Sequence, residues 1–360
     1  MKAQVLYKIG DLRYEDRDKP GVKEGNVLVR VRAAGICGSD VPRILKNGAH
    51  IHPIVCGHEF AGEVVEGDKK LLGKRVTVFP LIPCRKCKMC EAGQYQLCRH
   101  YDYLGSRSDG AFGEYVSVPV ENLAEIGDNV SFEAAAMTEP FSVAYHAVQI
   151  AFGDIDEISP EVLKQKVTVW GAGTIGLMLT MLLKARGFKN IYVIGNREYN
   201  RQSVLNLIGD DIHFIPYWEE DFKDIFQSKM GDEGSMTIFD CVGRPEVFEG
   251  AVELAPPTGQ IILVGNPLAD LGLKREIYWK ILRNELTLKG VWNSYFDIRG
   301  NHMGKDRAKD SWTGVLKLME RKEVDPEKLI THRTELKDLM TNIRMMNERS
   351  EDYIKVMCVM

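Results

Sequence analysis

The sequence has little of the features that would place a protein on a nucleic acid or in a membrane. It has no strongly basic stretch, and its formal net charge is −4. Neutralising phosphates needs clustered Lys and Arg, so a nucleic acid is disfavoured as the main partner. The longest apolar run, Ile175–Leu183, is about half the length that a bilayer requires. The segment MKAQVLYKIG at the N-terminus has no apolar core of signal-peptide length, so we expect no membrane partner.

Internal repeats and low-complexity segments are also missing, and the composition is that of a globular protein. The 360 residues suffice for two domains with full cores. Apolar content is 44% and charged content is 27%, both ordinary values. Eight cysteines without an export signal indicate a reducing compartment, which predicts a cytoplasmic location.

The most informative feature that is present is a cluster of four cysteines. Cys84, Cys87, Cys90 and Cys98 have the spacing C-x2-C-x2-C-x7-C. Four thiolates this close make a complete tetrahedral shell for a structural zinc, with no open position for chemistry. Disulfides are the alternative, but two-residue gaps make strained bridges. The spacing therefore predicts a structural zinc lobe over residues 84–98.

The order of the elements predicts an α/β protein with two parts. Short alternating runs such as Val27–Val31 and Arg75–Val78 indicate a β-rich domain in the first 145 or so residues. The buried strand Val167–Trp170 then leads into a glycine-rich turn, an amphipathic helix and a second strand at Asn190–Ile194. This strand–turn–helix–strand unit is typical of a doubly wound parallel sheet, the Rossmann arrangement.

The glycine-rich turn has the pattern G-x-G-x-x-G in the context that predicts a dinucleotide site. Gly171 allows the tight turn, Gly173 lets a pyrophosphate approach the backbone, and Gly176 lets helix and strand pack closely. The N–H groups of the first helical turn, which includes Thr174 and Ile175, are free to bind phosphates. A purely structural β–α turn is the alternative.

The end of the second strand bears on the choice of dinucleotide. An NAD site usually has Asp or Glu there to hold the ribose 2′-hydroxyl, but this strand ends in Gly195, Asn196 and Arg197. Arg197 can form a charge-assisted fork with a 2′-phosphate, with Asn196 and Arg201 beside it. This combination predicts NADP rather than NAD. The alternative is that Arg197 is a solvated charge and Glu198 binds the ribose.

A second group of metal-binding residue types lies in the β-rich part. Cys37 and His58 are zinc ligands in many proteins, and a carboxylate from Glu139 or Glu59 would complete three protein ligands and leave a fourth position open. From these residues alone, a buried cysteine and a core histidine are the better interpretation.

Together these segments resemble the zinc-dependent medium-chain alcohol and polyol dehydrogenases along essentially the whole chain. The motifs that carry the resemblance are Gly35–Asp40, Gly57–Glu59, the four-cysteine lobe, Asp109–Tyr115, Glu139-Pro140 and Gly171–Gly176.

Membership would imply a GroES-like catalytic domain formed by residues 1–145 and 290–360, with a Rossmann domain at 146–289. It would also imply two zinc ions per chain, with a catalytic zinc on Cys37, His58 and Glu139, and Glu59 nearby. Ser39 would pass the substrate proton toward solvent.

The resemblance is strongest toward members that act on polyol phosphates, in Cys37–His50 and Tyr101–Arg107. The member that these segments match has Asp where this chain has Gly195, and it uses NAD. The Gly195-Asn196-Arg197 pattern is instead similar to NADP-dependent secondary alcohol dehydrogenases. The predicted substrate is therefore a polyol or sugar phosphate, oxidised with NADP.

A sugar phosphate needs a cationic contact, and Arg43 and Lys46 follow the Cys37 loop at helical spacing. By family position, Trp292, Asn293 and Tyr295 would line the substrate pocket. Surface solvation of the two cations and core packing of the three other side chains are the alternatives.

The alternatives to this function are three: an NAD-dependent dehydrogenase of an unphosphorylated polyol, a non-catalytic NADPH-binding member of the fold, and a zinc-ribbon nucleic-acid binder. The last is disfavoured by the acidic balance. The family forms dimers and tetramers, so we expect a homodimer or homotetramer. Gln260–Val264 and Glu285–Val291 are the candidate segments at the edge of the Rossmann sheet.

Overall fold

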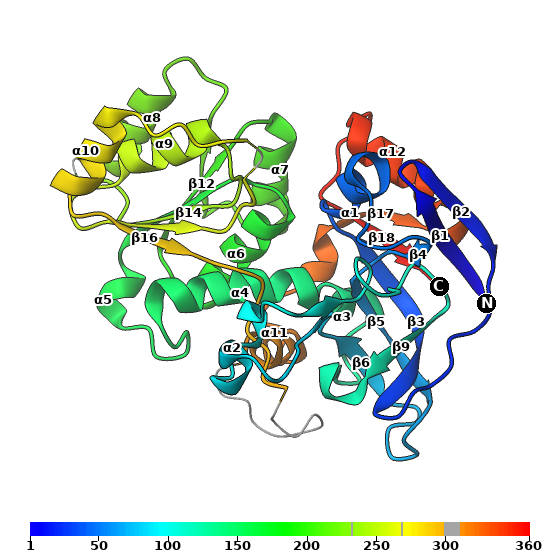
Figure 1. The fold of residues 1–360 in the computed structure, drawn as a ribbon. Coiled ribbons are helices and arrows are strands. Elements are labelled where there is room, and N and C mark those ends of the chain that lie inside the picture. Colours follow the sequence, from blue (N-terminus) through cyan, green and yellow to red (C-terminus); the bar gives the residue numbers. More distant parts are fainter. Residues whose placement is uncertain (232, 268, 299–309) are drawn as a thin grey trace. The chain divides into compact units, whose positions relative to one another are not determined.

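The computed structural model describes residues 1–231, 233–267, 269–298 and 310–360, which form two compact units (Figure 1). One unit comprises residues 1–142 and 294–360, and the other comprises residues 143–293. The sequence predicts boundaries three or four residues away, at 145/146 and 289/290. Within the described residues, no helix combines the length and the apolar character needed to cross a bilayer.

The first unit is β-rich and built around a seven-stranded sheet. Its order is β10-β6-β5-β3-β18-β17, with β9 also paired to β3. Two smaller sheets, β2-β1-β4 and β7-β8, complete its strands. The strands are β1 (Lys2–Lys8), β2 (Asp11–Asp16), β3 (Asn26–Ile36), β4 (Ile54–Val55), β5 (Glu59–Glu66), β6 (Arg75–Val78), β7 (Leu81–Ile82), β8 (Asp102–Tyr103), β9 (Tyr115–Pro119), β10 (Leu123–Glu125), β17 (Ile330–Thr334) and β18 (Lys355–Val359).

Short helices connect the strands of this unit. They are α1 (Asp40–Pro42), the π-helical turn η1 (Arg43–Asn47), α2 (Lys88–Glu91), η2 (Tyr95–Leu97), η3 (Val120–Asn122), α3 (Phe132–Ala136), α11 (Ser311–Glu320), η4 (Pro326–Leu329), η5 (Leu336–Asp338) and α12 (Leu339–Glu348). The core between them is formed by alternating apolar residues of β3 and β5 and by apolar residues of α12. Because β3 is the longest strand and pairs with β5, β9 and β18, it brings distant parts of the chain together.

The second unit has a six-stranded parallel sheet in the order β13-β12-β11-β14-β15-β16. This is the doubly wound Rossmann order. Its strands are β11 (Lys166–Trp170), β12 (Asn190–Gly195), β13 (His213–Pro216), β14 (Thr237–Asp240), β15 (Gln260–Leu263) and β16 (Thr287–Gly290). The candidate edge segment at Gln260–Val264 is wrong, because β15 pairs with strands on both sides and only β16 ends the sheet there.

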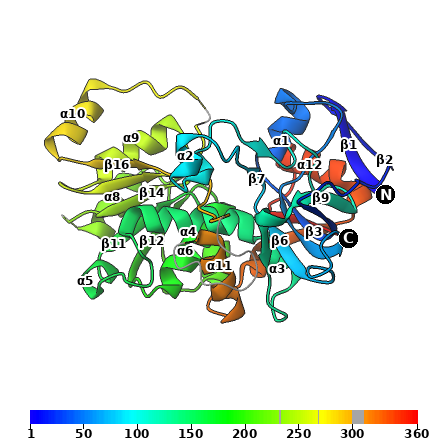
Figure 2. The same cartoon turned by 60° about the horizontal axis from the view of Figure 1, so that its bottom comes forward.

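Helices cover both faces of this parallel sheet, with α9 and α10 on one face and α4 and α6 on the other (Figure 2). The helices are α4 (Thr138–Phe152), α5 (Pro160–Leu163), α6 (Thr174–Ala185), α7 (Glu198–Leu207), α8 (Phe222–Met230), α9 (Pro245–Leu254) and α10 (Arg275–Arg283). Since both faces are covered, the central strands are apolar almost throughout, as in the buried residues Val167–Trp170. The α/β fold class predicted from the sequence is confirmed.

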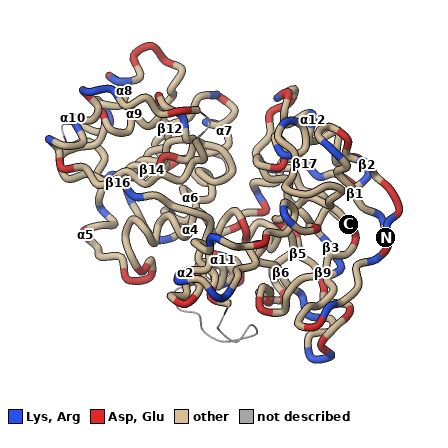
Figure 3. Tube along the Cα trace, viewed as in Figure 1, with Lys and Arg blue, Asp and Glu red and all other residues tan. Residues whose placement is uncertain are grey.

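Acidic and basic residues are interspersed along the chain in both units (Figure 3). The formal net charge of −4 is thus not concentrated in one segment of the chain.

Candidate metal and cofactor sites

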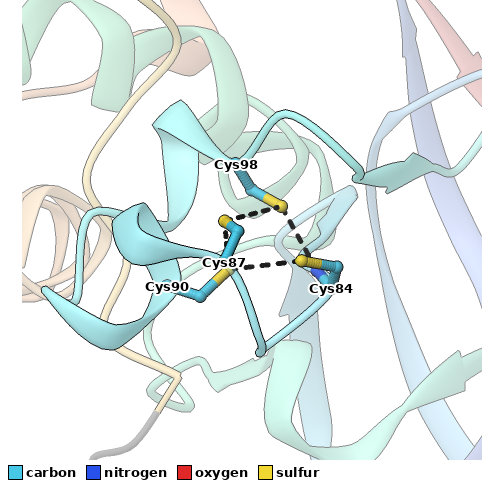
Figure 4. A group of neighbouring side chains, drawn as sticks. All are labelled: Cys84, Cys87, Cys90 and Cys98. Carbon is cyan, nitrogen blue, oxygen red and sulfur yellow. Dashed lines mark hydrogen bonds between the residues drawn. The ribbon is translucent and has the colours of Figure 1, made fainter.

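The four lobe cysteines surround one point in the loop between β7 and β8 (Figure 4). The Sγ atom of Cys87 is 3.5 Å from that of Cys90 and 3.9 Å from that of Cys98, and the Sγ atoms of Cys84 and Cys90 are 4.0 Å apart. A tetrahedral zinc with bonds of about 2.3 Å to sulfur requires edges of about 3.8 Å. All eight cysteines of the chain are free thiols, so these four are available as a zinc shell rather than as disulfides.

Backbone geometry prepares the lobe thiols for a metal. Cys87 is the N-cap of α2, which presents Cys90 one turn later. Hydrogen bonding from the Cys90 backbone lowers the pKa of the Cys87 thiol to about 6, and the Cys84 backbone N–H donates to Cys98 Sγ at 3.3 Å. The donor at Cys87 favours the thiolate, the form that binds zinc, whereas burial raises the pKa of the Cys90 thiol to about 12 and also raises the pKa of the Cys98 thiol.

A second cluster joins Cys37, His58 and Glu59. Cys37 follows the end of β3, whereas His58 and Glu59 lie at the start of β5, the strand paired with β3. One ligand atom from each of the three lies within 4.8 Å of the others. Thiolate, imidazole and carboxylate are a donor set that fits zinc with a fourth position left open.

Asp40 supports two members of this cluster from a fully buried position. Its Oδ2 accepts a hydrogen bond from the Cys37 backbone N–H at 3.1 Å, and its Oδ1 lies 3.4 Å from His58 Nδ1. Burial opposes ionisation of Asp40, but His58 and Arg43 still hold the pKa of this carboxyl below its usual value. With Nδ1 facing a carboxylate, Nε2 is the His58 nitrogen that remains for a metal.

Arg43, predicted as a phosphate contact, pairs its guanidinium with Asp40 in the structure. Its charge is thus largely balanced inside the protein, although 18% of the side chain remains exposed. Lys46, the other predicted cation, lies exposed at the end of η1.

Glu59 has a second partner, the buried lysine Lys355. Lys355 Nζ donates to Glu59 Oε2 and, at 3.0 Å, to the carbonyl oxygen of Ile36. Gly35 makes room for this pair, because a Cβ there would lie 2.4 Å from Glu59 Oε2 and 2.7 Å from Lys355 Cε. The lysine compensates the charge of a carboxylate that is only 2% exposed.

Glu139, the third ligand implied by the resemblance, lies at the start of α4 and is held by Tyr103. The Tyr103 hydroxyl donates to Glu139 Oε1 at 3.2 Å, and the Tyr103 ring packs edge-on against His58 at 5.7 Å. Burial raises the pKa of Glu139 to about 7. Of the two carboxylates, Glu59 rather than Glu139 belongs to the compact group with Cys37 and His58.

Ser39 lies beside the same group. Its hydroxyl donates to Cys37 Sγ at 3.3 Å, so the predicted proton-transfer residue and a predicted ligand are in direct contact.

The glycine-rich turn has the geometry that a pyrophosphate requires. Gly171 has a φ of 110°, and a Cβ on Gly176 would lie 1.7 Å from the Gly171 carbonyl oxygen, so both positions require glycine. A Cβ on Gly173 would meet nothing within 4 Å, which leaves open space at the N-terminus of α6. Gly173 caps α6 without a side-chain hydrogen bond, so the first turn at Thr174 and Ile175 faces this space with its backbone.

The turn after β12 has no room for an acidic residue. A Cβ on Gly195 would lie 2.6 Å from Phe214 Cζ. Arg197 follows as the N-cap of α7 and donates from Nε to Asn200 Oδ1 at 3.3 Å. Glu198, the alternative ribose ligand, is paired with Arg201 at 2.9 Å, and Asn196 is exposed.

The other three predicted substrate residues are divided between the two units. Trp292 is 51% exposed and Asn293 has a φ of 54°, and both belong to the unit of residues 143–293. Tyr295 is half-buried and belongs to the other unit. The structure of each unit by itself does not join these three to the metal cluster.

Sequence reasoning did not assign roles to Asp40, Tyr103 or Lys355. Asp40 lies inside the Gly35–Asp40 motif, so the sequence contained a signal that could have identified it. Lys355 had a weaker signal, a single charge in the apolar run Ile354–Val359. Nothing local points from either Tyr103 or Lys355 to the metal cluster, because their partners are 36 and 296 positions away.

The fold and these two clusters define a class, the zinc-type dehydrogenases that bind a nicotinamide dinucleotide. Family models agree: residues 23–128 match the alcohol dehydrogenase GroES-like domain, and residues 174–321 match the zinc-binding dehydrogenase domain. The chain is 32% identical over 355 residues to galactitol 1-phosphate 5-dehydrogenase of Escherichia coli K12, with 96% of each chain covered. The chain therefore belongs to the zinc-dependent medium-chain dehydrogenases and is an oxidoreductase.

Solved structures of similar proteins agree over the whole length. The crystal structure of galactitol-1-phosphate dehydrogenase from Escherichia coli superposes with a TM-score of 0.86 at 30% identity, with 100% of both chains covered. A dehydrogenase from Escherichia coli CFT073, solved with NADH, has a TM-score of 0.85 at 26% identity and covers 100% of this chain and 99% of its own.

Proposed function

We propose that the chain is a zinc-dependent, NADP-linked dehydrogenase that oxidises a secondary alcohol of a polyol phosphate and reduces a ketose phosphate in reverse. The observation that carries this proposal is the buried group of Cys37, His58 and Glu59, with its supporting Asp40 and Lys355. These residues form a zinc donor set with an open position. The chain is also 32% identical, over 96% of its length, to galactitol 1-phosphate 5-dehydrogenase, an enzyme that acts on galactitol 1-phosphate.

The residues of this group have separate roles. Cys37, His58 and a carboxylate hold the catalytic zinc, and Cys84, Cys87, Cys90 and Cys98 hold a structural one, which makes two zinc ions per chain. When bound, the catalytic zinc acts as a Lewis acid that lowers the pKa of a coordinated hydroxyl. Asp40 orients the His58 ring through Nδ1. Ser39 would accept the hydroxyl proton and pass it toward solvent, and a dinucleotide bound at the glycine turn would supply the hydride acceptor for the carbinol carbon.

Two carboxylates are candidates for the third ligand. Glu139 is the ligand that the family implies, and its hydrogen bond from Tyr103 at 3.2 Å orients it. Glu59 is closer to Cys37 and His58, but Lys355 already compensates its charge. We propose that Glu139 binds the metal and that Glu59 lies close by, where it would exchange with the water at the fourth position.

The cofactor is proposed to be NADP. The glycine turn at Gly171–Gly176 is open to a pyrophosphate at Gly173. Gly195 leaves no carboxylate to repel a 2′-phosphate, and Arg197 supplies a planar guanidinium for it, with Asn196 and Arg201 beside it. Glu198, the alternative ribose ligand, has its carboxylate engaged by Arg201 at 2.9 Å.

The substrate is proposed to be a polyol or sugar phosphate because of the galactitol 1-phosphate relative. Arg43 and Lys46 remain proposed phosphate contacts, although Asp40 balances the charge of Arg43. Trp292, Asn293 and Tyr295 remain proposed pocket residues. An NAD-linked oxidation of a free polyol is the second candidate, since sorbitol dehydrogenase of Halalkalibacterium halodurans is 28% identical over 92% of each chain.

The lobe thiols bear on the cellular location of the protein. Four lobe cysteines bind zinc only while they are reduced, so we propose a cytoplasmic location. We also propose a homodimer or homotetramer, with the exposed edge strand β16 and the exposed apolar side chains of the amphipathic helix α10 forming the contact between copies.

The test is a comparison of initial rates on zinc-loaded protein. Galactitol 1-phosphate and galactitol are each oxidised with NADP and with NAD, and zinc per chain is counted by elemental analysis. We expect the highest kcat/KM for galactitol 1-phosphate with NADP, and two zinc ions. A higher kcat/KM for galactitol would contradict the phosphate assignment, and a higher kcat/KM with NAD would contradict the cofactor assignment.

A further inference from the structure

Arg107 is a cation for which the described part of the chain supplies no counter-charge. It lies in the turn after β8, where its backbone N–H donates to the Tyr103 carbonyl at 2.9 Å. Its guanidinium stacks over the Tyr101 ring with its central carbon 4.8 Å from the centroid. The Nε atom is buried and has no hydrogen-bond partner. The Nε atoms of Arg32 and Arg186 are also buried without a partner, but each of these arginines forms an ion pair with a carboxylate, which the described residues do not supply to Arg107.

The acidic residues nearest in sequence are already engaged elsewhere. Asp109 forms an ion pair with Arg17 at 3.1 Å and accepts a hydrogen bond from the Val55 backbone N–H at 2.9 Å. Asp102 accepts from the Tyr103 backbone N–H at 2.7 Å. Within the described residues Arg107 has no ion pair with a carboxylate, in contrast to Arg43, which is paired with Asp40.

The turn that carries Arg107 is continuous with the metal site. The rings of Tyr101 and Tyr103 lie 6.2 Å apart, and Tyr103 contacts both His58 and Glu139. The loop after η1 is attached to the same turn, because the His50 backbone N–H donates to the Ser106 carbonyl at 3.2 Å. All these residues belong to one unit, so their mutual placement does not depend on the other.

We propose that Arg107, ahead of the ion-paired Arg43 and the exposed Lys46, is the main contact of the substrate phosphate and sets the preference for a polyol phosphate over a free polyol. The inference rests on the proposed function and adds a specificity residue to it. A guanidinium presents parallel N–H donors that match two phosphate oxygens, and because Nε is buried, the two terminal Nη groups are the donors that Arg107 has for such a fork. The Tyr101 ring fixes the plane of the fork, which lowers the entropic cost of binding.

The test compares substrates that differ only in the phosphate. KM and kcat are measured for galactitol 1-phosphate and for galactitol in the unmodified protein, in Arg107→Gln and in Arg107→Lys. Inorganic phosphate is used as a competitive inhibitor of the same variants. Arg344→Gln is the matched control, since Arg344 is an exposed arginine of α12 in the same unit. Melting temperature is recorded for every variant.

For Arg107→Gln we expect KM for galactitol 1-phosphate to rise about 10- to 100-fold, the effect of one lost charged hydrogen-bond pair. The inhibition constant of inorganic phosphate should rise in parallel, while KM for galactitol stays unchanged. For Arg107→Lys, KM for galactitol 1-phosphate should lie between the values of the unmodified protein and of Arg107→Gln, because lysine keeps the charge but lacks the parallel N–H donors.

Two results would overturn the inference in different ways. If the unmodified protein prefers the phosphate substrate and Arg107→Gln keeps that preference, Arg107 is not the phosphate ligand, and the proposed function stands. If the unmodified protein shows no preference for phosphorylated substrates across a panel of pentitol and hexitol phosphates, the proposed substrate class and the inference both fail.

Discussion

At the scale of single residues, the pair of Lys355 and Glu59 is the most consequential feature of the site. Both side chains are nearly inaccessible, at 3% and 2% exposed. A buried ion pair contributes little relative to an apolar pair, but removal of one partner leaves the other charge unpaired. The lysine therefore holds a charged carboxylate next to a proposed metal ligand.

We predict that Lys355→Met lowers the free energy of unfolding by about 3–5 kcal/mol, because Glu59 would be left charged and buried. The double variant Glu59→Gln with Lys355→Met should recover part of the loss. Urea unfolding measures both. Lys337→Met, which removes an exposed lysine paired with Glu335, should leave stability unchanged. A Lys355→Met variant as stable as this control would show that the pair carries no stability.

Glu139 gives a prediction on pH. Burial raises its pKa to about 7 from an ordinary value of 4.5. A carboxyl whose pKa is higher in the folded state binds its proton more tightly there, so its contribution to stability is full below about pH 4.5 and is lost as the pH rises through 7. In metal-free protein this loss amounts to roughly 3 kcal/mol.

The measurement is urea unfolding of chelated protein between pH 5 and pH 8, for the unmodified chain and for Glu139→Gln. Titrations of other groups are common to both and cancel in the difference. The difference in free energy of unfolding between the unmodified chain and Glu139→Gln should change with pH. The same difference for Glu348→Gln, which alters an exposed glutamate, should stay constant. An identical pH slope in the unmodified chain and in Glu139→Gln would refute the shift.

At the scale of elements, strand pairing explains which parts of the site could be predicted from the sequence. The four cysteines of the lobe are local, so their spacing alone identifies them. Cys37 and His58 are separated by α1, η1 and β4, and only the resemblance joined them. Lys355 reaches Glu59 because β18 pairs with one edge of β3 and β5 with the other, which sets Val356 opposite Ile36 and Gly35 opposite Glu59. Such register is tertiary information that no local pattern contains.

The parallel sheet was easier to predict than the β-rich unit for a related reason. Its strands alternate with helices, so each strand–helix repeat is visible along the chain. The position of β15 was nevertheless misjudged, because strand order depends on crossovers and not on sequence order.

The turn between β12 and α7 gives a prediction on the cofactor. Arg197→Ser should raise KM for NADP about 10- to 100-fold by removing a charged contact with the 2′-phosphate. The simple exchange Gly195→Asp is obstructed by Phe214, which a Cβ would approach to 2.6 Å. Only the triple variant Gly195→Asp, Arg197→Ser and Phe214→Leu should therefore prefer NAD.

Steady-state kinetics with both cofactors measure this shift, and Arg201→Ser serves as the comparison because Arg201 is already paired with Glu198. Arg201→Ser should affect KM for NADP less than Arg197→Ser does. If Arg197→Ser leaves KM for NADP unchanged, the ribose pocket lies elsewhere.

At the scale of the whole molecule, one region of the unit of residues 143–293 exposes more apolar surface than a monomer needs. Large side chains of α10, β16 and the segments beside them are about 40–60% exposed: Leu271 49%, Leu273 49%, Tyr278 52%, Trp279 51%, Leu282 58%, Leu288 39% and Trp292 51%. β16 is also an unpaired edge of the sheet. Exposed edges and apolar patches of this kind are usually covered by a partner, and a second copy offers the same edge.

We predict that the unmodified protein is a dimer or tetramer in size-exclusion chromatography with light scattering and that Trp279→Glu weakens assembly by about 30-fold or more. Trp279 stacks against Arg283 at 4.7 Å, and a tryptophan in the centre of an interface typically contributes 2 kcal/mol or more. The matched control is Trp218→Glu, an exposed tryptophan of the same unit that follows β13 at the opposite edge of the sheet. Since Trp218 follows β13 and not the exposed apolar side chains of α10 and β16, Trp218→Glu should assemble like the unmodified chain. A monomeric unmodified protein, or equal assembly of both variants, would place the apolar surface of α10 outside any interface between copies.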